Sequence, residues 1–409
     1  MTRDVRVLAR AKLTLSLRVL GRRPDGYHEL DALVVSLREP HDVVGLRIQA
    51  PFGVRVRLSG RAVIGVPADD TNLAARAARL LLDAAAEGDD PGPWAASGLD
   101  ISLHKSIPSG AGLGGGSADA AGTLVGGARL LGLDLDPTVL AALGASLGSD
   151  VPFCVTGGIA RMRGRGEIVE PLPFPGGAAR SPGLTGAWSP ARMSPWLPGV
   201  PTAGSWPPGP PGRPVPPGPP ASPVPPGPPV PPGPPGPPVP PGPPVRSGPP
   251  VPPGATWLPP GPPPGPSAGT PWPTGPEPAG LSLVVAVPPF GLATPMVYRA
   301  WDELGGPSSD RVVPLPSGLA GPGVPDQLVN DLEPAAEHLE PRLRPFREAL
   351  ERLAGGPALL AGSGSAYVVP VASPAQAAVV ATQAGVELRA MAFATGLAPR
   401  GVEAQKGPD

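Results

Sequence analysis

The sequence predicts an α+β protein that is interrupted by a long proline-rich insert. Apolar residues alternate with polar ones in the first part of the chain, which is the pattern of half-buried strands. From residue 71 onward apolar residues recur at helical spacing, and strand patterns return after residue 157. Because strands come first, then helices, then strands again, the order favours an α+β fold over a doubly wound parallel sheet.

The opening strands predict a mostly antiparallel sheet. Residues 13–19 alternate between apolar and polar side chains, so one face of this strand enters the core and the other stays polar. A Pro-Asp-Gly turn at 24–26 leads into a more apolar run at 33–35, and residues 54–58 alternate again. Short turns between such runs are typical of antiparallel neighbours.

Two helices are predicted in the middle of the first domain. The first follows Thr71, whose hydroxyl can accept hydrogen bonds from free N–H groups, and it places the apolar residues of 73–84 on one stripe. A short strand at 99–103 comes next. The second helix starts at Asp136-Pro137, which combines a capping side chain with proline at the first helical position, and we expect it to end at Gly148.

Asp150 stands just beyond that second helix, and further strand and helix patterns follow it. Residues 157–170 and 281–287 have strand patterns, and residues 333–354 have a helical pattern. A last glycine cluster at 362–364 predicts a tight turn.

The insert has a composition that cannot form a packed core. Residues 181–280 hold 43 prolines, four charged residues and five of the seven tryptophans. Proline fixes φ and lacks an amide donor, so we expect a disordered or extended polyproline II segment. A collagen helix is excluded because valine stands where only glycine fits, at Val224, Val230, Val239 and Val245. Two interpretations follow: a solvated loop without a binding role, or a docking segment for proline-recognition domains.

Charge and cysteine content restrict the function classes. The formal net charge of −1 does not favour a nucleic-acid surface, which needs many phosphate contacts. The single cysteine, Cys154, excludes an intramolecular disulfide and any multi-cysteine zinc site. We find no signal-peptide pattern at the amino terminus and no apolar run of membrane-spanning length. The sequence therefore predicts a cytoplasmic protein with no nucleic-acid or membrane partner.

The strongest local signal is the glycine-rich loop, IPSGAGLGGGSADAA at 107–121, which leads into a helical stretch. Its glycines can adopt positive φ and turn successive N–H groups toward one point, which makes an anion site at a helix N-terminus. The loop fits neither GxxxxGK[ST] nor GxGxxG after a first strand. Ser117 can offer its hydroxyl to phosphate or to Mg²⁺. The loop glycines are Gly110, Gly112, Gly114, Gly115 and Gly116.

The motifs around this loop resemble those of the GHMP family of small-molecule kinases, in particular a branch whose members phosphorylate the alcohol of a cytidine diphosphate ester. The resemblance covers residues 5–176 and 281–370. Glycine loops occur throughout the superfamily, whereas DGYHEL and LGSDVPF in order on either side of one are specific to the branch. The matching motifs are Lys12, DGYHEL at 25–30, the glycine loop, LGSDVPF at 147–153, GRGE at 164–167, PFGLATPMVY at 289–298, NDLE at 330–333 and GSG at 362–364.

The resemblance implies a fold of two domains with an active site in the cleft between them. Residues 1–176 would form a ribosomal-protein-S5-like α+β domain with a left-handed crossover, and residues 281–400 a smaller ferredoxin-like domain. The insert at 177–280 has no family counterpart, and we expect it to be disordered. Family members use ATP and Mg²⁺, so the implied small-molecule partners are ATP and a cytidine diphosphate ester.

The resemblance also implies roles for individual residues. Asp150 would accept the proton of the substrate hydroxyl, and Lys12 would orient that hydroxyl and stabilise developing negative charge. This agrees with phosphoryl-transfer chemistry, which mainly requires in-line placement and charge neutralisation. A carboxylate beside an ammonium stays ionised at neutral pH and can accept a proton. The residues that match positions near ATP are Asn72, Lys105, Pro108, Gly110, Gly112, Gly114, Gly115, Gly116 and Ser117.

At the substrate end, Tyr27 and His28 match residues that hold the cytosine ring by stacking and hydrogen bonding, and Tyr298 matches the aromatic residue on the other face of the ring. Stacking on an aromatic plane contributes about 1–3 kcal/mol per base. Thr14 stands where the family usually has asparagine and offers a single hydroxyl contact. Gly362, Ser363 and Gly364 match the glycine turn that closes the site.

Three functions remain open from the sequence. The chain can be the cytidyl-ester kinase, another GHMP alcohol kinase acting on a sugar, homoserine or mevalonate, or an inactive kinase fold that serves as a proline-rich scaffold. The aromatic residues favour the first, because a substrate without a base has no use for a stacking site. Retention of Lys12, Asp150 and the loop glycines argues against the third. A monomer and a homodimer are both compatible with the sequence.

Overall fold

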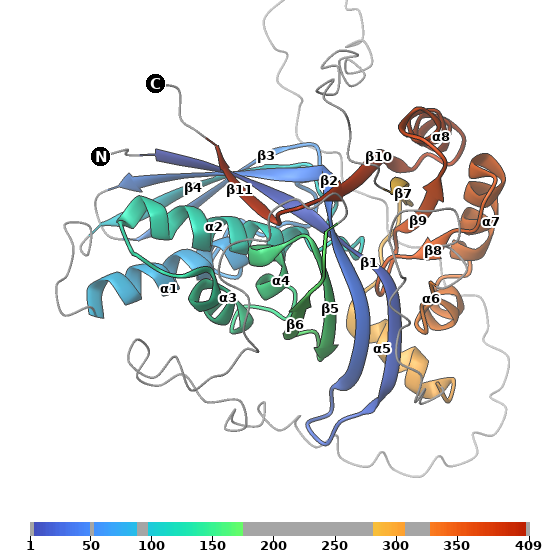
Figure 1. Cartoon of the computed structure of the whole chain (residues 1–409), viewed down its shortest axis with the longest axis horizontal. Helices are drawn as coiled ribbons and strands as arrows, with labels where there is room; N and C mark the ends of the chain where they lie inside the picture. Colours follow the sequence, from blue (N-terminus) through green and yellow to red (C-terminus); the bar gives the residue numbers. More distant parts are fainter. Residues whose placement is uncertain (1–3, 50–52, 88–96, 175–280, 307–327, 406–409) are drawn as a thin grey trace, which may run out of the picture. The chain divides into compact units, whose positions relative to one another are not determined.

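The structure is a computed structural model of the chain (Figure 1). The predicted insert at 177–280, with its tryptophans, lies outside the described residues. Described residues before and after the insert belong to one compact unit, and the predicted domain boundaries at 176 and 281 stay a prediction. The described residues are 4–49, 53–87, 97–174, 281–306 and 328–405.

A mostly antiparallel sheet forms the amino-terminal part, as predicted. Its strands are β1 (Asp4–Arg22), β2 (His28–Gln49), β3 (Val54–Gly60), β4 (Gly98–Lys105), β5 (Ile159–Gly164), β6 (Ile168–Pro171) and β11 (Val402–Gln405). The long strand β2 pairs antiparallel with β1, β4 and β5. β3 runs parallel to β4, and β11 returns from the end of the chain to pair with β1.

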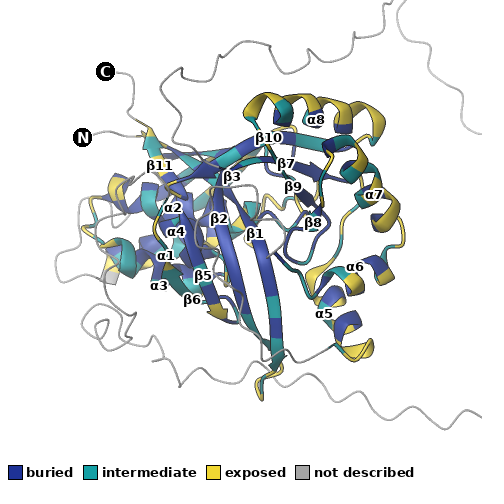
Figure 2. Ribbon diagram, turned by 45° about the vertical axis from the view of Figure 1, so that its right-hand side comes forward, coloured by how far each residue is buried: buried dark blue, intermediate teal, exposed yellow. Residues whose placement is uncertain are grey.

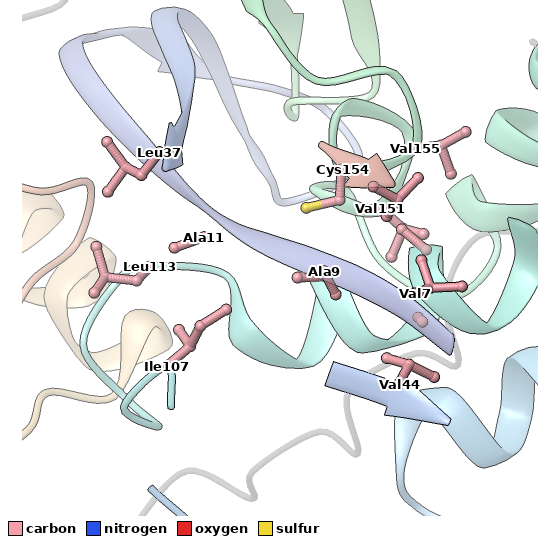
Figure 3. Close-up of a cluster of buried hydrophobic side chains, with 14 of the residues drawn as sticks. Val7, Ala9, Ala11, Leu37, Val44, Ile107, Leu113, Val151, Cys154 and Val155 are labelled. Carbon is pink, nitrogen blue, oxygen red and sulfur yellow. The ribbon is translucent and has the colours of Figure 1, made fainter. Parts of the chain in front are cut away.

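Helices cover one face of this sheet (Figure 1). They are α1 (Leu73–Glu87), α2 (Gly115–Leu131), α3 (Pro137–Ala145) and α4 (Val151–Thr156). The core between them includes small residues of β1, such as Ala9 and Ala11, and Cys154 of α4 (Figure 3). α2 lies very close to the sheet, because a Cβ atom at Gly126 would be 2.7 Å from Val7 Cγ2. Any larger residue there would require the side chains of Val7 and Leu46 to shift.

The carboxyl-terminal part has the ferredoxin-like topology that the family resemblance implied. Its elements in chain order are β7 (Ser282–Val287), α5 (Thr294–Glu303), α6 (Glu333–Leu339), α7 (Leu343–Ala354), β8 (Leu359–Leu360), β9 (Tyr367–Val371), α8 (Pro374–Glu387) and β10 (Met391–Ala398). The strands lie in the order β10-β7-β9-β8, and all neighbours are antiparallel. β10 also pairs with β2, so the strands of both parts are joined in one sheet. α7 buries Leu343, Phe346 and Leu350 and exposes its other face (Figure 2).

Several element boundaries differ from the sequence prediction. The helical pattern at 333–354 is two helices, because Pro341 has no amide hydrogen and disfavours helical backbone in the residue before it. The strand pattern at 157–170 is the hairpin of β5 and β6. The helix that starts at Pro137 ends at Ala145 instead of Gly148. The predicted cap Asp136 is confirmed, since its side chain accepts the Thr138 N–H.

The cap of α1 is Asn72, and the prediction of Thr71 was wrong. The Asn72 Oδ1 atom accepts the Ala74 N–H at 2.9 Å. Thr71 instead donates from its N–H and its hydroxyl to Asp69 Oδ1. Because Thr71 is hydrogen-bonded to the Asp69 carboxylate, it does not cap the helix, and Asn72, the next polar residue, caps α1 instead.

Candidate active site

One pocket of about 760 Å³ brings the predicted site residues together. All of them line it except Gly364. The lining comes from β1, the start of β2, the glycine loop, the first turn of α2, the residues before α4 and Tyr298 of α5. Residues that are far apart in the sequence thus face one space, in which a nucleotide and a second molecule could lie side by side.

Lys12 and Asp150 form an ion pair at the wall of this pocket. Lys12 Nζ lies 3.3 Å from Asp150 Oδ2 and donates to Thr14 Oγ1 at the same distance. Lys12 and Thr14 are two apart on β1, so they share a face of the strand. Asp150 directly precedes α4, but its side chain makes no capping hydrogen bond. Its carboxylate therefore remains free of helix contacts, and it can accept a proton from a hydroxyl that binds in the pocket beside it and Lys12.

The glycine loop is held from two sides by backbone hydrogen bonds. The Lys12 N–H donates to the Leu113 carbonyl at 3.0 Å, and the Ala366 N–H donates to the Ala111 carbonyl at 3.2 Å. The first contact fixes the catalytic candidate Lys12 relative to the loop. The second fixes the loop relative to the turn at 362–364.

Only part of the loop uses positive φ, which corrects the sequence prediction. Gly110, Gly112 and Gly114 have φ between +68° and +77°. Gly115 and Gly116 are the first helical residues of α2, so their backbone is right-handed. At Gly115 the space is limited by Ile107, whose Cγ2 atom would lie 3.0 Å from an added Cβ.

The N-terminus of α2 has the properties of an anion site. Gly114 precedes the helix and makes no side-chain cap, so the first N–H groups of α2 are available to a ligand. Free N–H groups and the helix dipole both favour a phosphate at this position. Ser117 lies in the same turn and lines the pocket. A Cβ atom at Gly148 would be 3.9 Å from Ser117 Oγ, which places this hydroxyl beside the segment that leads to Asp150.

Aromatic side chains gather at another part of the pocket wall. The His28 ring stacks on Tyr298, with ring centroids 4.8 Å apart, and meets Trp301 edge-on at 5.5 Å. His28 Nε2 lies 2.8 Å from Asp302 Oδ1. Burial, reinforced by the charge of Asp150, raises the pKa of the Tyr298 hydroxyl, so this group stays neutral. His28 thus occupies one face of the Tyr298 ring.

Tyr27 has a different environment from the other aromatic residues. Its side chain is exposed, and the Arg165 guanidinium lies 4.8 Å from its ring centroid. A cation over an aromatic face is a favourable contact, so a base that stacks on this face of Tyr27 must displace Arg165. Arg165 belongs to the GRGE motif, but no role for it was predicted from the sequence.

Two residues predicted to lie near ATP have structural contacts that use their polar groups. Besides capping α1, Asn72 donates from Nδ2 to the Pro67 carbonyl. Lys105 Nζ donates to Asp42 and Asp119, and only 2% of the residue is exposed. Burial alone would lower the pKa of the Lys105 ammonium, but the two carboxylates outweigh burial and raise that pKa. The ammonium therefore stays charged while facing protein carboxylates.

Asn330 holds the closing glycine turn and was not predicted as a site residue. Its Nδ2 atom donates to the carbonyls of Leu360 and Gly362, both at 2.7 Å. The turn is also linked to α5, because Ser363 Oγ lies 2.8 Å from Thr294 Oγ1. The NDLE motif signals Asn330, but its function depends on a turn some thirty residues later.

Comparisons with known proteins agree with this geometry. Residues 72–158 match the family model described as "GHMP kinases N terminal domain". The chain superposes on a crystal structure of 4-(cytidine 5'-diphospho)-2C-methyl-D-erythritol kinase with a TM-score of 0.56 and 26% identity. The superposition covers 96% of this chain and 98% of that one. The chain therefore has the GHMP kinase fold, as the sequence resemblance implied. Homoserine kinase from Cytophaga hutchinsonii, at 15% identity, TM-score 0.56 and coverage of 99% of this chain and 98% of that one, shares the fold.

A more specific similarity comes from curated relatives. The 4-diphosphocytidyl-2-C-methyl-D-erythritol kinase of Moorella thermoacetica is 46% identical over 165 residues, which are 40% of this chain and 53% of that protein. The relative from Synechocystis with the same name is 44% identical over 165 residues, 40% of this chain and 50% of that protein. The match thus spans about half the length of these relatives.

Within the described residues, we find no helix that is long and apolar enough to cross a membrane. The same residues contain no cluster of three or more histidine, cysteine or acidic side chains that could hold a metal ion by themselves.

Proposed function

We propose that the chain is a kinase that transfers the γ-phosphoryl group of ATP to the 2-hydroxyl of 4-diphosphocytidyl-2-C-methyl-D-erythritol, a step of isoprenoid precursor synthesis. The observation that supports it most is the Lys12–Asp150 pair beside the uncapped N-terminus of α2 in one pocket. The similarity to relatives of that name supports the choice of substrate. The predicted cytoplasmic location, and a state of monomer or homodimer, belong to this proposal.

In the proposed reaction the oxygen of the substrate hydroxyl forms a bond to the γ-phosphorus while the bond between that phosphorus and the ADP oxygen breaks. Asp150 accepts the proton that the hydroxyl loses. Lys12 orients the hydroxyl and neutralises charge that develops on the transferred group. The N–H groups at the start of α2 hold the ATP phosphates in line. General-base assistance of this kind contributes about 10²–10⁴-fold to the rate.

The donor set of the pocket fits Mg²⁺ as a partner of ATP. Mg²⁺ is usually bound by one or two protein groups together with nucleotide phosphates, and Ser117 in the first turn of α2 is the residue that would contribute. When bound, the ion supplies charge neutralisation at the phosphates. Asp150 would not be needed to bind the ion, because its carboxylate is paired with Lys12 Nζ at 3.3 Å, and it stays available as the base.

Steady-state assays with a panel of alcohols test the proposed function. The full chain with ATP and Mg²⁺ is incubated with the cytidyl ester, methylerythritol phosphate, homoserine or mevalonate, and ADP release is measured. We expect activity with the cytidyl ester alone, because the aromatic residues bind a base that the other molecules lack. Equal activity on homoserine or mevalonate would show another GHMP alcohol kinase, and ADP release with none of them would support a non-catalytic scaffold.

The Tyr298→Ala variant tests the base-binding role of the aromatic residues. Removing the ring takes away an aromatic surface on which the base can stack and the ring that stacks on His28. We therefore expect KM for the cytidyl ester to rise about tenfold or more, as loss of one stacking contact predicts. KM for ATP should change less than about twofold, because the ring contact that the variant loses is with His28. Equal changes in both KM values would place the base elsewhere.

A further inference from the structure

Three ionisable side chains, Asp42, Lys105 and Asp119, form a buried cluster, and Lys105 and Asp119 line the pocket. Lys105 Nζ donates to Asp42 Oδ2 and to Asp119 Oδ2, at 2.5 Å each. None of the three residues is more than 2% exposed. We call this group the Asp–Lys–Asp cluster.

The Asp–Lys–Asp cluster connects the two ends of the glycine loop. Asp42 belongs to β2, and its Oδ1 atom accepts the N–H groups of Ser106 and Ile107 at 2.6 and 2.9 Å, at the point where β4 ends and the loop begins. Asp119 belongs to α2, which begins where the loop ends. Through Lys105, therefore, the first residues of the loop are tied to the helix whose N-terminus faces the pocket.

Given the nucleotide site proposed above, we propose that the Asp–Lys–Asp cluster is a clamp that fixes the glycine loop in its phosphate-binding geometry. Lys105 then acts as a positioning residue and does not contact the nucleotide. Asp42 and Asp119, for which the sequence suggested no role, are the other two positioning residues.

Energetics support a positioning role for the cluster. A buried ion cluster contributes little net stability, because the cost of removing charges from water offsets their attraction. Its effect is to specify one arrangement of the segments that it joins. Here those segments are β2, the end of β4 and α2, and a loop that presents backbone N–H groups to phosphates depends on their placement being fixed.

The Asp119→Leu variant separates the clamp from a direct contact. It removes one carboxylate but leaves Lys105 paired with Asp42, so no uncompensated charge remains buried. Asp119→Asn is the conservative variant, since an amide oxygen can still accept from Lys105. Its amide nitrogen can occupy the position of Oδ1, which has no hydrogen-bond partner among the described residues. Glu337→Leu is the matched control, because it removes a buried carboxylate that is paired with Arg344 and Arg347 and does not line the pocket.

The measurements are the Kd of ADP by calorimetry, the KM for ATP and for the cytidyl ester, and the melting temperature. The clamp predicts that Asp119→Leu raises the Kd of ADP and the KM for ATP about tenfold or more, as expected when a loop is misplaced, with little change in KM for the cytidyl ester. Asp119→Asn should restore most of the affinity, and Glu337→Leu should lower the melting temperature without changing ADP binding.

Two results would overturn the clamp. If Lys105 contacts the phosphates directly, Asp119→Leu frees its ammonium, and unchanged or tighter ADP binding would overturn the clamp. Equal losses in the leucine and asparagine variants would overturn it too. ADP binding needs no second substrate, so a parent chain that binds ADP but does not phosphorylate the cytidyl ester contradicts the proposed function alone. A parent chain that does not bind ADP contradicts both.

Discussion

The Asp150→Asn variant is expected to lose about three orders of magnitude in turnover, within the range that general-base catalysis contributes. Asparagine keeps the shape of the side chain but cannot accept the proton of the substrate hydroxyl. The change should affect kcat far more than the KM for ATP, because the group acts in the transition state. Single-turnover rates and ADP affinity measured on the same protein separate these effects.

Stability should change little in this variant. Asp150 makes no capping hydrogen bond to α4, and the amide oxygen of asparagine can still accept a hydrogen bond from Lys12, which pairs with Asp150 at the pocket wall. Asp134→Asn, at an exposed position between α2 and α3, is the control for loss of one negative charge. Turnover of Asp150→Asn within about tenfold of the parent would rule out Asp150 as the base, since that is below the usual contribution.

The Gly112→Ala variant is expected to lower nucleotide affinity by about two orders of magnitude, which is the cost of displacing binding groups by about 1 Å. Gly112 has φ +77°, and a Cβ atom there would lie 2.3 Å from the Ala361 carbonyl oxygen. A backbone oxygen cannot move aside as a flexible side chain can. The added methyl group therefore separates the loop from the glycine turn at 362–364, and we expect the Kd of ADP to rise accordingly.

Gly132→Ala is the matched control for this prediction. Gly132 has φ +69° at the end of α2, and an added Cβ would have no atom within 4 Å. Alanine at either position pays the left-handed backbone cost of about 1–2 kcal/mol, but only Gly112→Ala displaces the loop. Both variants should lose stability, Gly112→Ala more than Gly132→Ala because its Cβ also meets the Ala361 carbonyl oxygen, and only Gly112→Ala should lose ADP affinity. Equal ADP affinity in the two variants would show that phosphate binds elsewhere.

Local patterns in the sequence predicted the amino-terminal sheet and most helices, and the family resemblance implied that the site residues gather in one place. Alternation at 13–19 required one strand face to be polar, and that face carries Lys12 and Thr14 into the pocket. The cap at Asp136 was predictable because its partner Thr138 is two residues away. Such features depend on neighbours in the chain, so the sequence alone contains the information.

Features that depend on distant residues were not predictable in this way. Asp42 and Lys105 are 63 positions apart, and no local pattern pairs an aspartate in a long strand with a lysine that ends another. The choice of Asn72 over Thr71 as a cap is a local feature that the sequence analysis missed, because it depends on the carboxylate of Asp69, two residues before Thr71. The roles of Lys105 and Asn330 likewise became visible only when the fold placed their partners.

We expect the pocket to transfer the γ-phosphoryl group of ATP to the alcohol of a cytidine diphosphate ester, with Asp150 as the base. Phosphorus NMR of the full chain with ATP, Mg²⁺ and the cytidyl ester tests it most directly, because it identifies the new bond as well as the loss of ATP. We expect a new phosphomonoester signal to grow in step with ADP, coupled to the carbon that carries the 2-hydroxyl, and to be almost absent with Asp150→Asn. Inorganic phosphate as the product, or an equal signal with Asp150→Asn, would contradict it.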